Sequence, residues 1–116
     1  MIDFDGTITK KNEFPKIGEL RPGAIEGIKK LQSHGWKCCL WTCRTGATLE
    51  AAIDFLESQG LKMDGYNESP YDNRNFAGRK PIADVYIDDA SFPSKFNKSW
   101  LDWGMIVETL LHYYSN

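Results

Sequence analysis

Four aspartates directly follow two apolar segments, one at the start of the chain and one near its last quarter. Asp3 and Asp5 stand two positions apart, so on an extended chain their side chains lean to the same side. Asp88 and Asp89 repeat the pattern at the second segment. Neighbouring carboxylates repel one another, and a cation or a division of protonation states relieves that repulsion. Because carboxylate oxygens suit hard cations, the four aspartates predict a Mg²⁺ site.

Other polar residues accompany these acids in a fixed order. Gly6 allows a sharp turn after Asp5 and Thr7 adds a hydroxyl, whereas Thr42 ends an apolar segment and Lys80 precedes the second acidic pair. Each has an ordinary explanation by itself: an Asp-Gly turn, a helix cap or a surface lysine. Their joint occurrence in one order is much rarer, and it predicts a functional site.

The pattern of apolar residues predicts an α/β fold with a mostly parallel sheet. The first predicted strand ends at Asp3 to Asp5. Three further strands are predicted over residues 37–42, 61–66 and 83–87. Predicted helices run from Pro22 to Gly35, from about Leu49 to Gly60 and from Trp103 to Tyr114. Residues 6–20 and 67–78 are expected to be polar connections without a regular helix. Both acidic pairs then lie at the carboxyl ends of strands, where ligands bind in open α/β sheets.

Length and composition fit a single soluble domain over residues 1–116. The chain is 41% hydrophobic and 26% charged, with a net charge of −2. The sequence shows no basic face that would bind nucleic acid or an anionic membrane. The end of a nucleic acid is still one of the possible substrates. No apolar run reaches the roughly 18–20 residues that span a bilayer, and no signal peptide opens the chain. We therefore expect a cytoplasmic protein.

The three cysteines support a reducing compartment. Cys38 and Cys39 are adjacent, so they would point to opposite faces of a strand and make a poor disulfide pair. With Cys43 they match no zinc spacing, and we expect reduced thiols.

The first predicted strand is unusual because only two residues precede Asp3. A central strand usually has about five or six residues. The sequence leaves two explanations open: a very short first strand, or a native protein with a few more residues upstream.

The order Asp-x-Asp-Gly-Thr, then Thr42, then Lys80 shortly before Asp88-Asp89, resembles the haloacid dehalogenase-like hydrolase superfamily. All four motifs of that superfamily have a candidate here, spanning Asp3 to Asp89. The resemblance implies a three-layer Rossmann-like fold and a magnesium-dependent phosphatase. The segments 41–46 and 67–70 also resemble small bacterial and phage members.

The resemblance also implies catalytic roles. Asp3 would be the nucleophile that forms an aspartyl-phosphate, and Asp5 would protonate the leaving alcohol and then deprotonate water. Thr42 would donate a hydrogen bond to a phosphoryl oxygen, and Lys80 would add positive charge there. Around the substrate the resemblance places Gly6, Thr7, Cys43 and Arg44.

Mg²⁺ would bridge the phosphate and Asp3, with the Asp5 backbone carbonyl and Asp88, Asp89 or both as further ligands. Of the adjacent pair, we favour Asp88 as the direct ligand. Arg44 has two explanations: its planar fork binds a phosphate or a substrate carboxylate, or it is a surface arginine that pairs with a nearby acid. His34 and His112 lie near no motif and are expected at the surface.

Cap domains of this superfamily are inserted after the first motif or between the second and third. Neither gap here, 7–35 or 43–79, has room for one, so the chain resembles the capless class. Capless sites are open, and they take large substrates or use a partner or a second copy as a lid. The substrate class stays open among nucleotides, sugar phosphates, phosphoproteins and nucleic-acid ends.

Two other functions compete with a phosphatase. A non-catalytic, phosphate- or partner-binding module could keep the same fold. A response-regulator receiver domain also uses aspartates, threonine and lysine at a sheet edge. There the acidic pair comes at the first strand, whereas here the adjacent pair follows Lys80, so the order disfavours a receiver.

Overall fold

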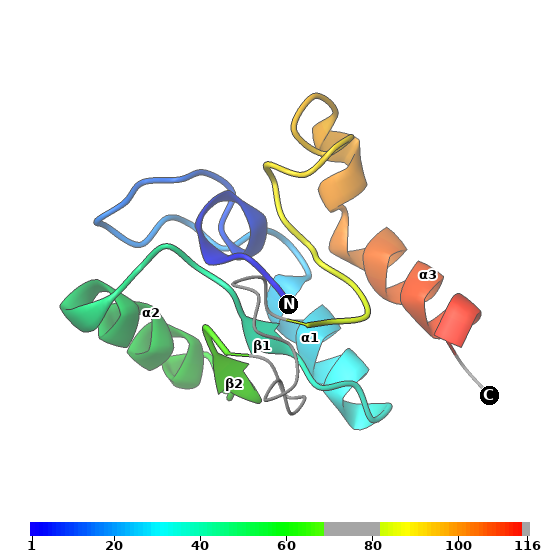
Figure 1. The fold of residues 1–116 in the computed structure, drawn as a ribbon, viewed down its shortest axis with the longest axis horizontal. Coiled ribbons are helices and arrows are strands. Elements are labelled where there is room, and N and C mark those ends of the chain that lie inside the picture. The colour runs from blue at the N-terminus through cyan, green and yellow to red at the C-terminus, as the bar shows by residue number, and fades with distance from the viewer. Residues whose placement is uncertain (69–81, 115–116) are drawn as a thin grey trace.

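The computed structural model describes residues 1–68 and 82–114. Three α-helices and two strands form its regular part: α1 (Ala24–Ser33), β1 (Cys39–Leu40), α2 (Gly46–Ser58), β2 (Gly65–Tyr66) and α3 (Trp103–Tyr114) (Figure 1). All three predicted helices are therefore confirmed, and the mixed helix and strand content agrees with an α/β chain.

Parallel pairing joins four segments of the chain. β1 pairs with β2 through Cys39 with Gly65 and Leu40 with Tyr66. Ile2 forms parallel bridges to both Leu40 and Ile87. The segments therefore lie side by side in the order Ile87, Ile2, β1, β2. The prediction of a parallel arrangement is confirmed, although the regular strands are shorter than expected.

Helix α1 begins and ends at glycines with positive φ. Gly23 precedes it at φ 78° and Gly35 follows it at φ 88°, a conformation that glycine adopts without strain. The apolar residues at spacings of three, Ile25, Ile28 and Leu31, are all buried. This is the face that the periodicity predicted to enter the core.

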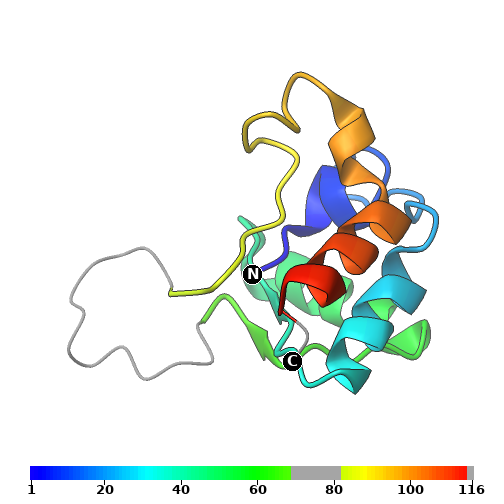
Figure 2. The ribbon, with the colours of Figure 1, turned by 90° about the vertical axis from the view of Figure 1, so that its right-hand side faces the viewer.

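Helices α1 and α3 lie side by side in both views (Figures 1 and 2). The contact is close at Gly27, where an added Cβ would lie 3.0 Å from Cγ2 of Val107. In Figure 1, α2 lies on the other side of β1 and β2 from this helix pair. Ala52 and Leu56 are the fully buried residues of α2.

The connection predicted to be polar and irregular contains an ordered turn. Residues Phe4–Ile8 form one π-type turn, closed by the Thr9 N–H, which donates to the Phe4 carbonyl at 3.1 Å. Gly6, Thr7, Ile8 and Thr9 are buried. The sharp turn predicted at Gly6 is present, and a hydroxyl group replaces a missing backbone partner in it: Thr9 Oγ1 accepts the Gly6 N–H at 2.9 Å.

One short element near residue 100 was not predicted. Lys98–Leu101 form a 3₁₀ turn, and the side chain of Asn97 accepts the Ser99 N–H at its start. Among the described residues, no helix is long and apolar enough to cross a membrane.

The three cysteines are free thiols, as predicted. Cys38 and Cys39 are buried, whereas Cys43 is exposed. Burial raises the pKa of the Cys38 thiol to about 12, and the negative charge of Asp64 adds to the shift. His34 and His112 are exposed, as expected.

Candidate active site

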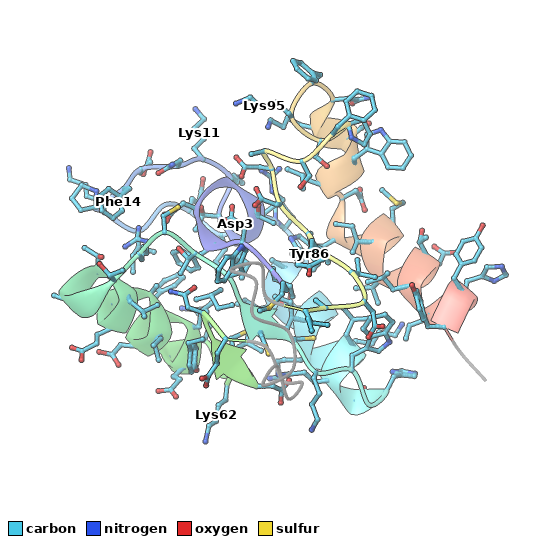
Figure 3. All side chains as sticks on the ribbon, viewed as in Figure 1. Asp3, Lys11, Phe14, Lys62, Tyr86 and Lys95 are labelled. Carbon is cyan, nitrogen blue, oxygen red and sulfur yellow. The ribbon has the colours of Figure 1, made fainter. Side chains whose placement is uncertain are left out.

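Backbone pairing brings Asp3 next to the second acidic pair. The Asp3 N–H donates to the Ile87 carbonyl at 2.9 Å, so the residues that follow Ile2 and Ile87 emerge at the same edge. Asp3, Asp88 and Asp89 each offer one carboxylate oxygen, and these oxygens lie within 4.8 Å of one another. We call these three residues the acidic cluster. In Figure 3 the label Asp3 marks the first segment of the cluster, and the label Tyr86 marks the segment that leads to Asp88 and Asp89.

The acidic cluster brings three carboxyl groups together in a partly buried space. Burial, a hydrogen bond with Asp89 and the charge of Asp88 together raise the pKa of Asp3 to about 8. The hydrogen bond from Thr7 acts in the opposite direction. A cation would relieve this repulsion, and three clustered carboxylates are the oxygen ligands that Mg²⁺ prefers. The donor set therefore fits Mg²⁺.

Thr7 connects the two halves of the acidic cluster. Its Oγ1 donates to Asp3 Oδ2 at 3.0 Å and accepts the Asp89 backbone N–H at 2.9 Å. Thr7 thereby fixes the distance between a residue at the start of the chain and one near residue 89. It was predicted as a substrate contact, and the structure gives it this bridging role.

The lack of a side chain at Gly6 lets Asp89 lie close to the backbone there. Gly6 has φ 85°, and an added Cβ would lie 2.5 Å from Asp89 Oδ2. An L side chain would be strained by the backbone conformation and would also collide with the cluster. The requirement for glycine is thus twofold.

Asp5 lies apart from the acidic cluster. Its two carboxylate oxygens accept hydrogen bonds from Nε and Nη2 of Arg44, both at 2.7 Å. The expectation that the carboxylates of Asp3 and Asp5 join one four-acid group is therefore not met. The Phe4–Ile8 turn begins directly after Asp3, so Asp5 belongs to the turn and its side chain pairs with Arg44 instead. A metal contact through the Asp5 backbone carbonyl stays a prediction of the resemblance.

Arg44 is buried, with 1% of its surface exposed. The expected pairing with a nearby acid is present, but its expected place at the surface is wrong. The turn of residues 4–8 brings Asp5 inward, and Arg44 follows it because an ion pair offsets the cost of burying either charge.

Thr42 lies beside the strand that carries Asp3, because the neighbouring Trp41 N–H donates to the Ile2 carbonyl at 2.8 Å. The Thr42 N–H donates to Asn67 Oδ1 at 2.8 Å, and Thr42 Oγ1 accepts the Arg44 N–H at 3.2 Å. Thr42 is therefore held at the same edge as the cluster. Lys80 lies outside the described residues, and its role stays a prediction.

Three residues near the site were not identified from the sequence. Arg21 donates to the carbonyls of Gly6 and Thr7 at 2.8 and 3.1 Å, and Trp103 Nε1 also donates to the Thr7 carbonyl, at 3.2 Å. Lys98 Nζ donates to the Asp89 carbonyl at 3.2 Å. These contacts cross the chain to backbone atoms, and no sequence pattern signals them.

One solved structure supports the fold over almost the whole chain. It is described as the structure of a conserved protein coded by a locus of Bacteroides thetaiotaomicron. The two chains are 33% identical with a TM-score of 0.81, and the match covers 98% of this chain and 89% of the other. No protein-family model matches the chain, and neither does any curated protein.

Proposed function

The chain belongs to the same family as this conserved Bacteroides thetaiotaomicron protein, and within that family we propose that it acts as a magnesium-dependent phosphohydrolase. The proposal rests on one observation above all. Asp3, Asp88 and Asp89 present their oxygens within 4.8 Å of one another at the carboxyl edge of neighbouring parallel segments. The motif order of the haloacid dehalogenase-like superfamily assigns those same residues to nucleophile and metal.

Each group has a defined part in the proposed reaction. Asp3 Oδ forms a bond to phosphorus while the bond from phosphorus to the ester oxygen breaks, and Asp5 gives that oxygen a proton. Water then attacks phosphorus, Asp5 takes its proton, and the bond from Asp3 to phosphorus breaks. Thr42 and Lys80 offset the charge on the phosphoryl oxygens. Bound Mg²⁺ would supply positive charge between the carboxylates and the phosphate.

The finer architecture is part of the same proposal. The segments follow the order β2, β1, Ile2, Ile87, which corresponds to 3-2-1-4 in a doubly wound sheet. With α2 on one side and α1 and α3 on the other, this order supports a three-layer Rossmann-like fold without a cap. We also propose that the protein is cytoplasmic and that its substrate is phosphorylated, with the class of substrate left open.

The direct test is turnover of an aryl phosphate with Mg²⁺ present. We expect activity that EDTA removes and that Asp3→Asn lowers by at least about a thousandfold, since both covalent steps need the carboxylate. Asp54→Asn is the matched control, because Asp54 is an exposed aspartate of α2. Full activity in Asp3→Asn would overturn the assignment of the nucleophile.

The alternative is a non-catalytic binding module. A specific observation keeps it in view: both oxygens of Asp5, the proposed acid, already accept hydrogen bonds from Arg44. If a broad panel of phosphate esters gave no turnover while calorimetry showed Mg²⁺ binding that Asp3→Asn removes, the module would replace the enzyme.

A further inference from the structure

Arg44 uses its whole guanidinium group within the protein. Nε and Nη2 bind the two oxygens of Asp5, and Nη2 also donates to the Lys16 carbonyl at 2.7 Å. Nη1 donates to the carbonyls of Pro15 and Thr48 at 3.2 and 3.3 Å. A guanidinium has five N–H donors, and these are five bonds. Arg44 therefore has no donor left for a phosphate.

Aromatic rings hold the same group in a fixed plane. Its central carbon lies 5.2 Å from the ring centres of both Phe4 and Phe14. Such contacts attract a cation to the face of a ring. The Arg44 side chain has no solvent exposure, and that of Asp5 has 11%. A buried fork bound at every donor cannot rotate without breaking several contacts together.

We propose that Arg44 is a positioning residue that fixes the carboxyl plane of Asp5 for proton transfer, an inference that rests on the proposed phosphohydrolase function. Each carboxylate oxygen has two acceptor sites, so the two bonds to Arg44 leave one site on each Asp5 oxygen for an ester oxygen or water. Through the carbonyls of Pro15, Lys16 and Thr48, Arg44 ties that orientation to the 15–16 loop and to α2.

The experiment compares two esters that differ in their need for an acid. Phenyl phosphate releases a basic phenolate that requires a proton, whereas 2,4-dinitrophenyl phosphate releases a phenolate that needs none at neutral pH. In Arg44→Lys the charge stays but the planar fork is lost. We expect kcat/KM for phenyl phosphate to fall about 100-fold and kcat/KM for the dinitrophenyl ester to fall less than about 10-fold, because kcat/KM reports formation of the aspartyl-phosphate and not the later attack of water, in which Asp5 serves both esters alike.

Two further variants separate positioning from general support of the turn. Arg21→Lys is the matched control, because Arg21 also holds backbone carbonyls near the site but does not contact Asp5, and it should slow both esters equally. Phe14→Ala removes one of the two rings that contact Arg44, and Phe14 is itself half-exposed. The variant should show the same selective loss of phenyl phosphate turnover, but a smaller one. This variant carries the test if thermal melting shows that Arg44→Lys does not fold.

The outcomes are distinct. Equal losses on both esters in Arg44→Lys and Phe14→Ala would overturn the positioning role and leave the phosphohydrolase intact. The positioning role would be supported if Arg44→Lys selectively lost phenyl phosphate turnover, if Asp5→Asn showed the same loss, and if combining the two substitutions did not enlarge it. A wild-type protein that hydrolyses neither these two esters nor any member of a broad panel of phosphate esters would overturn the proposed function itself.

Discussion

At the scale of single residues, the central feature is a nucleophile candidate that is costly to ionise. Asp3 shares a partly buried space with Asp88 and Asp89, and its pKa is raised to about 8 from 3.8. The folded protein without metal therefore holds a proton on Asp3 more tightly than the unfolded chain does. By linkage, this group stabilises the metal-free fold below about pH 4, and its contribution is lost as the pH rises to about 8.

Asp3→Asn should therefore flatten the pH dependence of stability in EDTA. Asparagine resembles the protonated aspartate and carries no charge to lose. At pH 8 the variant should exceed the wild type by on the order of 1–3 kcal/mol in free energy of unfolding, less than the full pKa shift implies because solvent screens the cluster. The two proteins should converge near pH 4. Urea unfolding at both pH values measures this, and parallel pH curves would contradict it.

Residue types and their order predicted much of the candidate site. Asp3, Asp88, Asp89 and Thr42 were all placed at one sheet edge, because strand ends can be read from apolar patterning. The partnership of Asp5 with Arg44 was not predicted, since it depends on which way a turn directs a side chain. Spacing alone gave the wrong direction because the chain turns between Phe4 and Ile8 instead of continuing as a strand.

At the scale of elements, the Phe4–Ile8 turn is the part that shapes the site. It carries Asp5, Gly6 and Thr7, and it is held from outside by Arg21 and Trp103. The sequence predicted the three helices well because their periodic apolar faces are local signals. A sharp turn at Gly6 was predicted, but the contacts that hold it were not, because they come from distant residues and from hydroxyl groups.

Gly6→Ala should damage the site beyond its cost in backbone strain. Gly35→Ala is the control, because Gly35 has nearly the same φ, 88° against 85°, and nothing within 4 Å of its added Cβ. Both variants should lose about 1 kcal/mol of stability from the left-handed conformation. Only Gly6→Ala should weaken Mg²⁺ binding as well, by about tenfold or more, since the new methyl group displaces Asp89.

Isothermal titration with Mg²⁺ and thermal melting of both variants give the measurement. Equal Mg²⁺ affinity in Gly6→Ala and wild type would mean that Asp89 moves aside without loss, and that the close approach at Gly6 is not needed for the metal.

At the scale of the whole molecule, the site joins parts of the chain that are far apart. The Asp89 N–H reaches Thr7 Oγ1 across 82 residues, and Ile2 lies between Leu40 and Ile87. The predicted parallel arrangement agrees with this, but the lateral order of the segments could not be read from local patterns. Pairing order depends on the tertiary fold and not on the period of any one segment.

Mg²⁺ should stabilise the whole molecule, because its ligands exist together only in the folded state. At a concentration one hundred times its Kd, it should add about 2.7 kcal/mol to the free energy of unfolding at pH 8. Asp88→Asn should reduce this gain, whereas Asp54→Asn should keep it. Thermal melting across a Mg²⁺ series measures the effect, and a melting temperature independent of Mg²⁺ would argue against a metal site.

The central place of Ile2 also bears on how the chain is made. A ribosome releases residue 3 well before residue 89, so Asp3 emerges before the neighbours that it meets in the folded protein. Ile2 can pair with Leu40 once residue 40 has emerged, but its pairing with Ile87 must wait until residue 87 has emerged. The three carboxyl groups of the acidic cluster can therefore meet only after α1, β1 and α2 have been synthesised, when the burial of those elements can offset the cost of bringing the acids together.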